Sequence, residues 1–286
     1  FAFGGEAIGD ISLKVDNKTT NVLSANMTLS GEGNDLALLG KYMTDNGNFD
    51  LNLDINQLNI KSIQGFSLGN ITDGKGALSG QFKITGNASE PKVNGELLFK
   101  DAGFRITKLN SYFSVNDEKI ALNNEEITFD TFTLFDENMN ELIVNGKIVS
   151  KNFRDFNFDL TVKADDFRAI HSKEVDNDLF YGDLFLDTKL KIGGTIDNPI
   201  VSGNIEINDE TKFTVVLPQS DPSIVDREGI VEFVDEDNLY LKQTVQLQKE
   251  LNQSKLIGMD VNVSITVNKE AEFTLVIDKG NGDYLN

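Results

Sequence analysis

Residues 76–99 have the sequence GALSGQFKITGNASEPKVNGELLF, and this stretch decides how the rest of the chain can be interpreted. Apolar residues alternate with polar ones on both sides of a central segment, as expected for half-buried strands with a period of two residues. Gly86 and Pro91 bound the central segment, and both residue types favour backbone angles of a turn rather than a strand. The stretch therefore predicts a β-hairpin with one apolar face.

A second hairpin of the same kind is predicted further along the chain, over residues 182–207. Its Gly and Pro residues follow those of the first hairpin at one constant spacing; Gly194 stands 108 residues after Gly86 (194 − 86 = 108). Strand-like segments upstream of the two hairpins also match, with 106 and 109 residues between equivalent positions. A spacing of about 107 residues predicts a long repeat whose units stack to bury apolar faces that one unit cannot bury alone.

The composition limits the class of protein. The chain has 286 residues, 39% of them hydrophobic, and a formal net charge of −20 from 26 basic and 46 acidic residues. Nucleic acid and anionic lipid headgroups attract basic patches, so neither is an expected partner of so acidic a chain. No apolar run approaches the ~18 residues of a membrane-spanning helix. Cysteine is absent, which excludes a disulfide framework and a thiolate zinc site.

Alternating segments separated by turns rich in Asn, Asp and Gly recur along nearly the whole chain. They predict an all-β fold of roughly 16–20 strands without a sustained helix. Because strand-like patterns stand at both ends, we expect the chain to be a piece of a longer protein. We expect one continuous elongated sheet made of a first strand block over 1–75, the first Gly/Pro hairpin and following strands over 76–141, a second repeat over 142–234, a flexible excursion over 235–257 and the start of a third cycle over 258–286.

Two segments depart from the alternation of strands. Residues 58–68 place Ile60, Ile63 and Phe66 at spacings that suit a bulge or one helical turn. Residues 167–180 occupy the equivalent place in the second repeat, and their sequence FRAIHSKEVDNDLF is compatible with a short helix there.

A search for catalytic or metal-binding residues finds no convincing constellation. His171 is the only histidine, and its polar neighbours indicate a solvated side chain in a loop or at a helix end. The acidic pairs Asp165-Asp166 and Glu125-Glu126, and the residues 235–237, are expected in solvated turns where strands end. Residues 235–246 begin like a calcium loop but lack its Gly and Glu at the sixth and twelfth positions, and residues 278–283 suit a hairpin turn better. We therefore expect no enzyme, no cofactor and no metal site.

The apolar face itself has two interpretations that periodicity cannot separate. It is either the core between two packed sheets or the lining of an open trough that meets a ligand. The repeat favours linear stacking, and the lining is aliphatic and Phe without Trp, which suits passage of an acyl chain along the trough. If the face is a trough, the residues expected to line it as a lipid-binding groove are Leu51, Leu53, Ile55, Phe82, Ile84, Val93, Leu97, Phe99, Val144, Ile148, Phe158, Leu160, Val162, Leu190, Ile192, Val201, Ile205, Ile207, Val261, Val263 and Ile265.

Three sequence features together carry a family resemblance. They are the repeated G-x4-P-x-V-x-G-x-[LI] hairpin, the block FDLNLDINQLNI at residues 49–60, and the succession of strand patterns over 227–286. In this order they resemble the C-terminal part of the TamB family, within the AsmA-like group, and are most similar to its members from Bacteroidota. The resemblance implies a long curled sheet, called a β-taco, with a hydrophobic groove along its length. It also implies a periplasmic protein, anchored to the inner membrane outside this chain and reaching the outer membrane.

The function implied by the resemblance is transport of phospholipids between the two membranes, with a possible contribution to outer-membrane protein assembly. Phospholipid acyl chains and an outer-membrane barrel protein of the TamA type are the implied partners. An apolar groove needs no nucleophile, base or metal to shield an acyl chain from water. Two alternatives stay open: a structural or adhesive β-array with a dry core, and a chaperone trough that offers sheet edges to unfolded barrel strands by β-augmentation.

Overall fold

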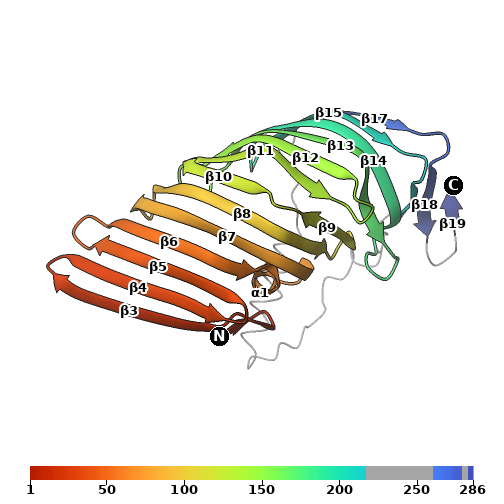
Figure 1. The fold of residues 1–286 in the computed structure, drawn as a ribbon. Coiled ribbons are helices and arrows are strands. Elements are labelled where there is room, and N and C mark those ends of the chain that lie inside the picture. Colours follow the sequence, from red (N-terminus) through yellow and green to blue (C-terminus); the bar gives the residue numbers. More distant parts are fainter. Residues whose placement is uncertain (217–259, 279–282, 286) are drawn as a thin grey trace, which may run out of the picture.

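A computed structural model of the chain describes residues 1–216, 260–278 and 283–285. Figure 1 shows one long, twisted and curled β-sheet, with the N-terminus and the C-terminus near its opposite ends. The strands are β1 (Ala2–Phe3), β2 (Glu6–Ala7), β3 (Asp10–Thr19), β4 (Val22–Gly31), β5 (Asn34–Met43), β6 (Asn48–Asn59), β7 (Ile71–Asn87), β8 (Pro91–Ile106), β9 (Ser111–Val115), β10 (Lys119–Asn124), β11 (Glu126–Phe135), β12 (Glu141–Val149), β13 (Asn157–Ser172), β14 (Phe180–Thr195), β15 (Pro199–Ile207), β16 (Lys212–Val216), β17 (Asp260–Val267), β18 (Glu272–Asp278) and β19 (Asp283–Leu285).

The sheet is built mainly as an antiparallel meander. Each strand from β3 to β8 pairs with the next one along the chain, and β8 then pairs with both β9 and β10. The meander continues from β10 to β14, and β14 pairs with β15 and β16, which lie end to end. Within the described residues this sheet has 17 strands, and β1 and β2 form a separate pair. The prediction of an all-β fold with a large curled sheet is confirmed.

Both predicted Gly/Pro hairpins are present. Gly86 faces Pro91 at the end of the β7–β8 pair, and Gly194 faces Pro199 at the end of the β14–β15 pair. Both glycines have left-handed backbone angles, with φ of 94° and 76°, which a side chain would strain. In the first turn, Asn87 Oδ1 also accepts the backbone N–H groups of the second and third residues after it. The two hairpins are equivalent, while the repeat length of about 107 residues stays a prediction.

The segment at residues 58–68 forms one helical turn, as predicted. The β6–β7 register shifts after Ile55, and the helix α1 (Ile60–Gln64) follows, continued by the 3-10 turn η1 (Gly65–Ser67). α1 packs chiefly against β7 at the end of that strand (Figure 1). These short helices are the ones present among the described residues.

The helix expected within residues 167–180 is absent, and that prediction was wrong. β13 instead runs on to Ser172 in register with β14, so that His171 faces Asp183 across the two strands. The register shifts twice, between Ala164 and Phe167 and again before Ile170. Each shift breaks the period of two residues, so the apolar spacing along the strand resembles that of a helix. The end of the predicted second repeat, residues 217–234, and residues 235–257, for which a flexible excursion was expected, lie outside the described residues.

Irregular register recurs at neighbouring places across the sheet. The pairing shifts in β6, β7, β11 and β13, at residues 55–58, 75–77, 129–132 and 164–167. Asp101, Thr131 and Asp166 lie at or beside these places and have left-handed backbone angles. A bulge bends the strand that carries it and increases its local twist, so a series of bulges accounts for the curl of the sheet.

The last strands pair in parallel, which the sequence interpretation did not foresee. β17 lies parallel to β15, and β18 lies parallel to β16. The stretches INDETKFTVV (207–216) and VNKEAEFTLV (267–276) align without a gap and are identical at five of ten positions, with Phe213 facing Phe273. In both stretches the same backbone turn, from Asn208 and from Asn268, separates the two short strands. This local similarity is the signal that could have predicted the pairing.

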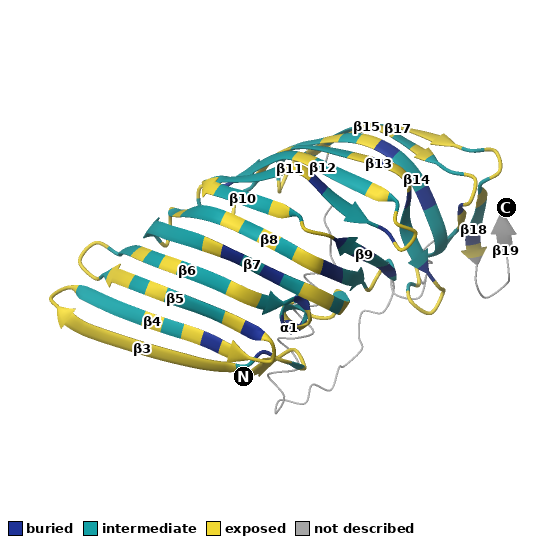
Figure 2. Cartoon of the chain, viewed as in Figure 1, coloured by how far each residue is buried: buried dark blue, intermediate teal, exposed yellow. Residues whose placement is uncertain are grey.

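Two buried clusters form the core, and both lie where the sheet curls over itself. The first joins Ile60 and Leu78 to residues of β8, β9 and β11, and the second consists of Phe113, Ala164 and Phe167. Phe113 and Phe167 stack with ring centroids 5.5 Å apart, which fastens β9 to β13. Figure 2 shows buried segments on β7, β9 and β14, whereas β3 is exposed along its whole length.

Candidate functional site: the apolar face of the sheet

Strand pairing places the predicted lining residues on one face of the sheet. Residues that face each other in a sheet point to the same side, and so do residues two apart in one strand. Leu53 faces Phe82 between β6 and β7, and Leu160 faces Ile192 between β13 and β14. β17 extends the same face, because Val261 pairs with Val201 and Ile265 pairs with Ile205. We call this side, with all the predicted lining residues on it, the apolar face.

None of the predicted lining residues is fully buried. Val261 and Ile265 are exposed, at 55% and 62%, and the others are half-buried. In a closed sandwich, side chains on the inner faces of the sheets would be packed on all sides. The described residues do not form such a sandwich over most of this face.

One part of the apolar face is nevertheless covered. Next to α1 and β9, side chains of this face pack into the two buried clusters. Leu97, Phe99 and Val144 pack against the buried cluster there, and the ring of Phe99 meets that of Phe132 at 5.2 Å. We call this the covered part, and the remaining lining residues the open part. The alternation of apolar and polar residues does not predict this division.

Further apolar side chains belong to the same face but were not among the predicted lining residues. They alternate with polar neighbours and pair directly with predicted residues or with one another, so the period of two residues could have identified them. They are Ile11, Leu13, Met27, Leu29, Leu36, Leu38, Ile120, Leu122, Ile127 and Phe129.

The opposite face of the sheet is charged. Cross-strand ion pairs join Lys83 to Asp50, Lys119 to Glu96 at 2.8 Å, and Lys147 to Glu126 at 3.1 Å. The hydrogen bond from Glu96 raises the pKa of Lys119 above its ordinary value. The strands that carry these pairs therefore present apolar groups to one side and charges to the other.

His171 lies in a strand, so its expected place in a loop or at a helix end was wrong. Its Nδ1 is 2.6 Å from Oδ1 of Asp183, and Arg168 joins Asp183 to Glu137. The side chain of His171 is 40% exposed. The arrangement is an ion-pair network between neighbouring strands and loops.

The acidic pairs are only partly where they were expected. Asp165 and Asp166 lie at the bulge within β13 rather than at a strand end, because two register shifts interrupt the strand there. Asp166 accepts a hydrogen bond from Asn208, and its N–H donates to Asp187. Glu125 and Glu126 lie at a turn, as expected.

The two segments that resemble calcium loops lie partly or wholly outside the residues that the structure describes. Residues 235–237 are outside the described residues. β18 and β19 pair antiparallel across residues 278–283, in keeping with the expected hairpin. In the described part of the chain, no group of three or more acidic, His or Cys side chains is arranged to hold a metal ion. The helices described are also too short and too polar to cross a membrane.

The family follows from comparison with known proteins. The family model of the TamB C-terminal domain matches residues 130–282, just over half of the chain. The chain belongs to the TamB family. The TamB match extends from β11 to the end of β18, and so includes the second Gly/Pro hairpin and the parallel strands. Searches among curated proteins and among solved structures found no match.

Proposed function

We propose that the open part of the apolar face is a hydrophobic groove that conducts phospholipid acyl chains between the inner and outer membranes. One observation carries the proposal: a continuous row of aliphatic and Phe side chains crosses the sheet from β3 to β17, mostly half-buried along the sheet and exposed on these two strands. Membership of the TamB family supports a role in lipid transport or outer-membrane protein assembly in the cell envelope. In this role the chain is a periplasmic, non-catalytic segment of a bridge.

The physical benefit of such a groove is the removal of an energy barrier. Each methylene group exposed to water costs roughly 0.8 kcal/mol, so a 16-carbon chain would face a barrier on the order of 10 kcal/mol. Side chains such as Leu160 and Ile192 already expose apolar surface and can contact an acyl chain without unfolding a core. The phospholipid headgroup stays in water at the open side of the sheet.

The remaining parts of the proposal concern partners. The face continues onto the edge strands β3 and β17, so neighbouring segments of a bridge could extend it on either side. An outer-membrane barrel protein of the TamA type and an inner-membrane anchor outside this chain are the partners we propose for its two ends.

A chaperone role is the second candidate, and a specific observation favours it. All ten residues of β3 are exposed, including Ile11 at 51% and Leu13 at 60%. An exposed edge strand with apolar side chains can accept another strand through backbone hydrogen bonds. Unfolded strands of outer-membrane barrels have this chemistry.

Site-specific photo-crosslinking tests the lipid proposal. A photoreactive residue at Leu160 should capture phospholipid in cells of a diderm bacterium, whereas one at Thr161 on the opposite face should not. Leu51 and Asn52 form an equivalent pair on β6. Mass spectrometry of the captured species identifies lipid or peptide.

The outcomes separate the two candidates. Lipid on Leu51 and Leu160 supports transport. Peptide captured along β3 without lipid on the apolar face supports the chaperone role. Equal capture at Leu160 and Thr161 would contradict a groove on one face.

A further inference from the structure

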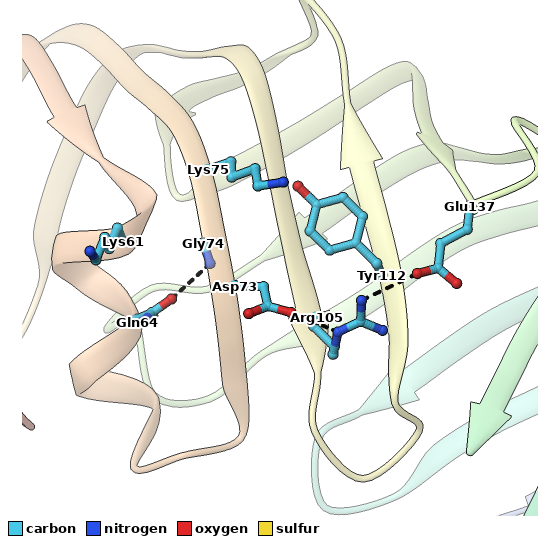
Figure 3. A pocket seen from close by; sticks show the side chains of 8 residues that line it. All are labelled: Lys61, Gln64, Asp73, Gly74, Lys75, Arg105, Tyr112 and Glu137. Atoms are coloured by element: carbon cyan, nitrogen blue, oxygen red, sulfur yellow. Dashed lines mark hydrogen bonds and ion pairs between the residues drawn. The ribbon is translucent and has the colours of Figure 1, made fainter. Parts of the chain in front are cut away.

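The face opposite the apolar face carries a second feature of interest, a polar cleft beside α1. Its larger part has a volume of about 600 Å³ and is lined by α1, β7, β8 and β9 together with Glu137 (Figure 3). A second part of about 470 Å³ adjoins it, since both parts are lined by Lys61, Gly74 and Lys75. Neighbouring strand residues point to opposite sides, so Arg105 and Tyr112 lie away from the buried Phe113 and the half-buried Phe104.

The cleft exists because the strands around it are irregular. The β7–β8 pairing is interrupted on both sides of Lys75, and Asp73 and Asp101 have left-handed backbone angles of 54° and 47°. Gly74 lies so close to α1 that a Cβ atom there would approach the backbone N of Lys61 to 2.9 Å. Its N–H donates to Gln64 Oε1 at 2.8 Å, which holds α1 against the strand (Figure 3).

Three lysines line the cleft without an acidic partner. Lys61, Lys75 and Lys100 are exposed, and in the described part of the chain none has a carboxylate within ion-pair distance. Arg105 differs, because Asp73 binds its Nε at 2.8 Å and Glu137 binds its Nη2 at 3.2 Å. Asp73 and Glu137 are thus engaged with Arg105, and Asp101, which also lines the second part of the cleft, forms no ion pair with these lysines in the described part of the chain. The ammonium groups of the lysines are therefore available to a ligand.

Tyr112 also lines this cleft and contacts one of its lysines. The Lys75 ammonium lies 5.5 Å from the centre of its ring, within the range of a cation–π contact. Burial raises the pKa of Tyr112, and the nearby Asp73 raises it further. Its hydroxyl therefore keeps its proton at neutral pH and can donate a hydrogen bond.

We propose that this cleft binds a phosphate group through Lys61, Lys75 and Lys100. All three lysines line the second part of the cleft, and their long side chains can turn toward one tetrahedral anion with several acceptor oxygens, which suits phosphate better than a planar carboxylate. The phosphate can be the free anion or part of a lipid headgroup. The site lies on the face opposite the proposed groove, so phosphate binding there does not depend on acyl-chain transport.

Titration with inorganic phosphate tests the site. Amide signals of Gly74 and Gly76 should shift to saturation in an NMR titration of the full chain. The triple variant K61Q/K75Q/K100Q should bind phosphate at least about tenfold more weakly. The matched control K163Q/K189Q/K191Q removes three exposed lysines from β13 and β14, outside the cleft, and should leave the affinity within about twofold.

Vesicles identify the source of the phosphate. The vesicles contain phosphatidylglycerol and phosphatidylcholine. If they bind the wild-type chain but not K61Q/K75Q/K100Q, the ligand is a lipid headgroup. If the chain binds inorganic phosphate but not the vesicles, the ligand is the free anion. Either result supports a phosphate site. The proposal is overturned if the wild-type chain binds neither probe, or if both triple variants lose binding equally. Lipid capture at Leu160 should persist in K61Q/K75Q/K100Q, which keeps this test separate from that of the groove.

Discussion

Asn34 joins three separate parts of the chain through one buried amide. Its Nδ2 donates to the carbonyl of Ile8 and to Ser62 Oγ, both at 2.8 Å, and its Oδ1 accepts the N–H of Asn59 at 2.7 Å. Because the side chain is only 3% exposed, water cannot replace these bonds. Asn34→Ala should therefore reduce the free energy of unfolding by about 1–3 kcal/mol, measured by denaturant titration.

A matched change on the same sheet provides the control. Asn56 donates one hydrogen bond to the exposed Asp35, so Asn56→Ala should cost less than about 0.5 kcal/mol. Equal stability of the two variants would show that Asn34 does not fasten the N-terminal segment and α1.

His171 is the residue at which hidden chemistry would be expected first. Its pair with Asp183 is partly exposed, and exposed ion pairs contribute about 0–1 kcal/mol. His171→Gln and the double change Asp165→Asn with Asp166→Asn should therefore leave lipid capture at Leu160 unchanged in a folded protein. A severe loss of capture in the folded His171→Gln chain would reveal a role that the geometry does not indicate.

At the scale of elements, β9 links the two buried clusters, because Val115 belongs to the first and Phe113 to the second. Phe113 is 6% exposed and stacks on Phe167, and Ser111 Oγ donates to the carbonyl of Ala169 at 3.1 Å, so an aromatic contact and a hydrogen bond hold β9 against β13. Phe113→Ala should cost about 3–5 kcal/mol of unfolding free energy, because it leaves a cavity between these strands. Leu39→Ala, at a side chain 42% exposed on the opposite face, should cost less than about 1 kcal/mol. A similar cost for both would mean that β9 is not packed as described.

Elements with a clean period of two residues could be predicted from sequence, and irregular ones could not. The Gly86 and Gly194 hairpins combine alternation with turn residues, and both formed where expected. Ile60 and Ile63 revealed the single turn of α1 through their spacing. By contrast, the bulges before Phe167 moved apolar residues out of phase and imitated a helix.

The candidate site could likewise be predicted only where the strands alternate regularly. Alternation assigned residues such as Leu53 and Leu160 to one face, because strand geometry fixes the side to which each residue points. It could not show that Phe99 and Val144 pack against a buried cluster that joins α1, β7, β8, β9 and β11, because those contacts depend on the path of the chain between distant strands. Nor could it bring Lys61, Lys75 and Lys100 together, since they come from three elements.

At the scale of the whole molecule, the decisive property is whether the apolar face is open to water. Leu160 is the fourth residue of β13 and lies half-buried between Gly146 and Ile192 of the neighbouring strands. Leu160→Arg should leave the chain folded, because a long side chain can lay its methylene groups on the face and keep its guanidinium in water. The charge should block passage of acyl chains, and lipid transport between membranes should fall to background.

Two matched variants make this result interpretable. Ala164→Arg, four residues along the same strand, would bury an unpaired charge in the second cluster, where Ala164 is 5% exposed; it should cost several kcal/mol and unfold the chain. Thr161→Arg places the charge on the opposite face and should leave both folding and transport intact. If Leu160→Arg unfolds as Ala164→Arg does, the face is a closed core. If it folds and still transports lipid, the path of the acyl chains does not cross Leu160, and the groove must be sought elsewhere.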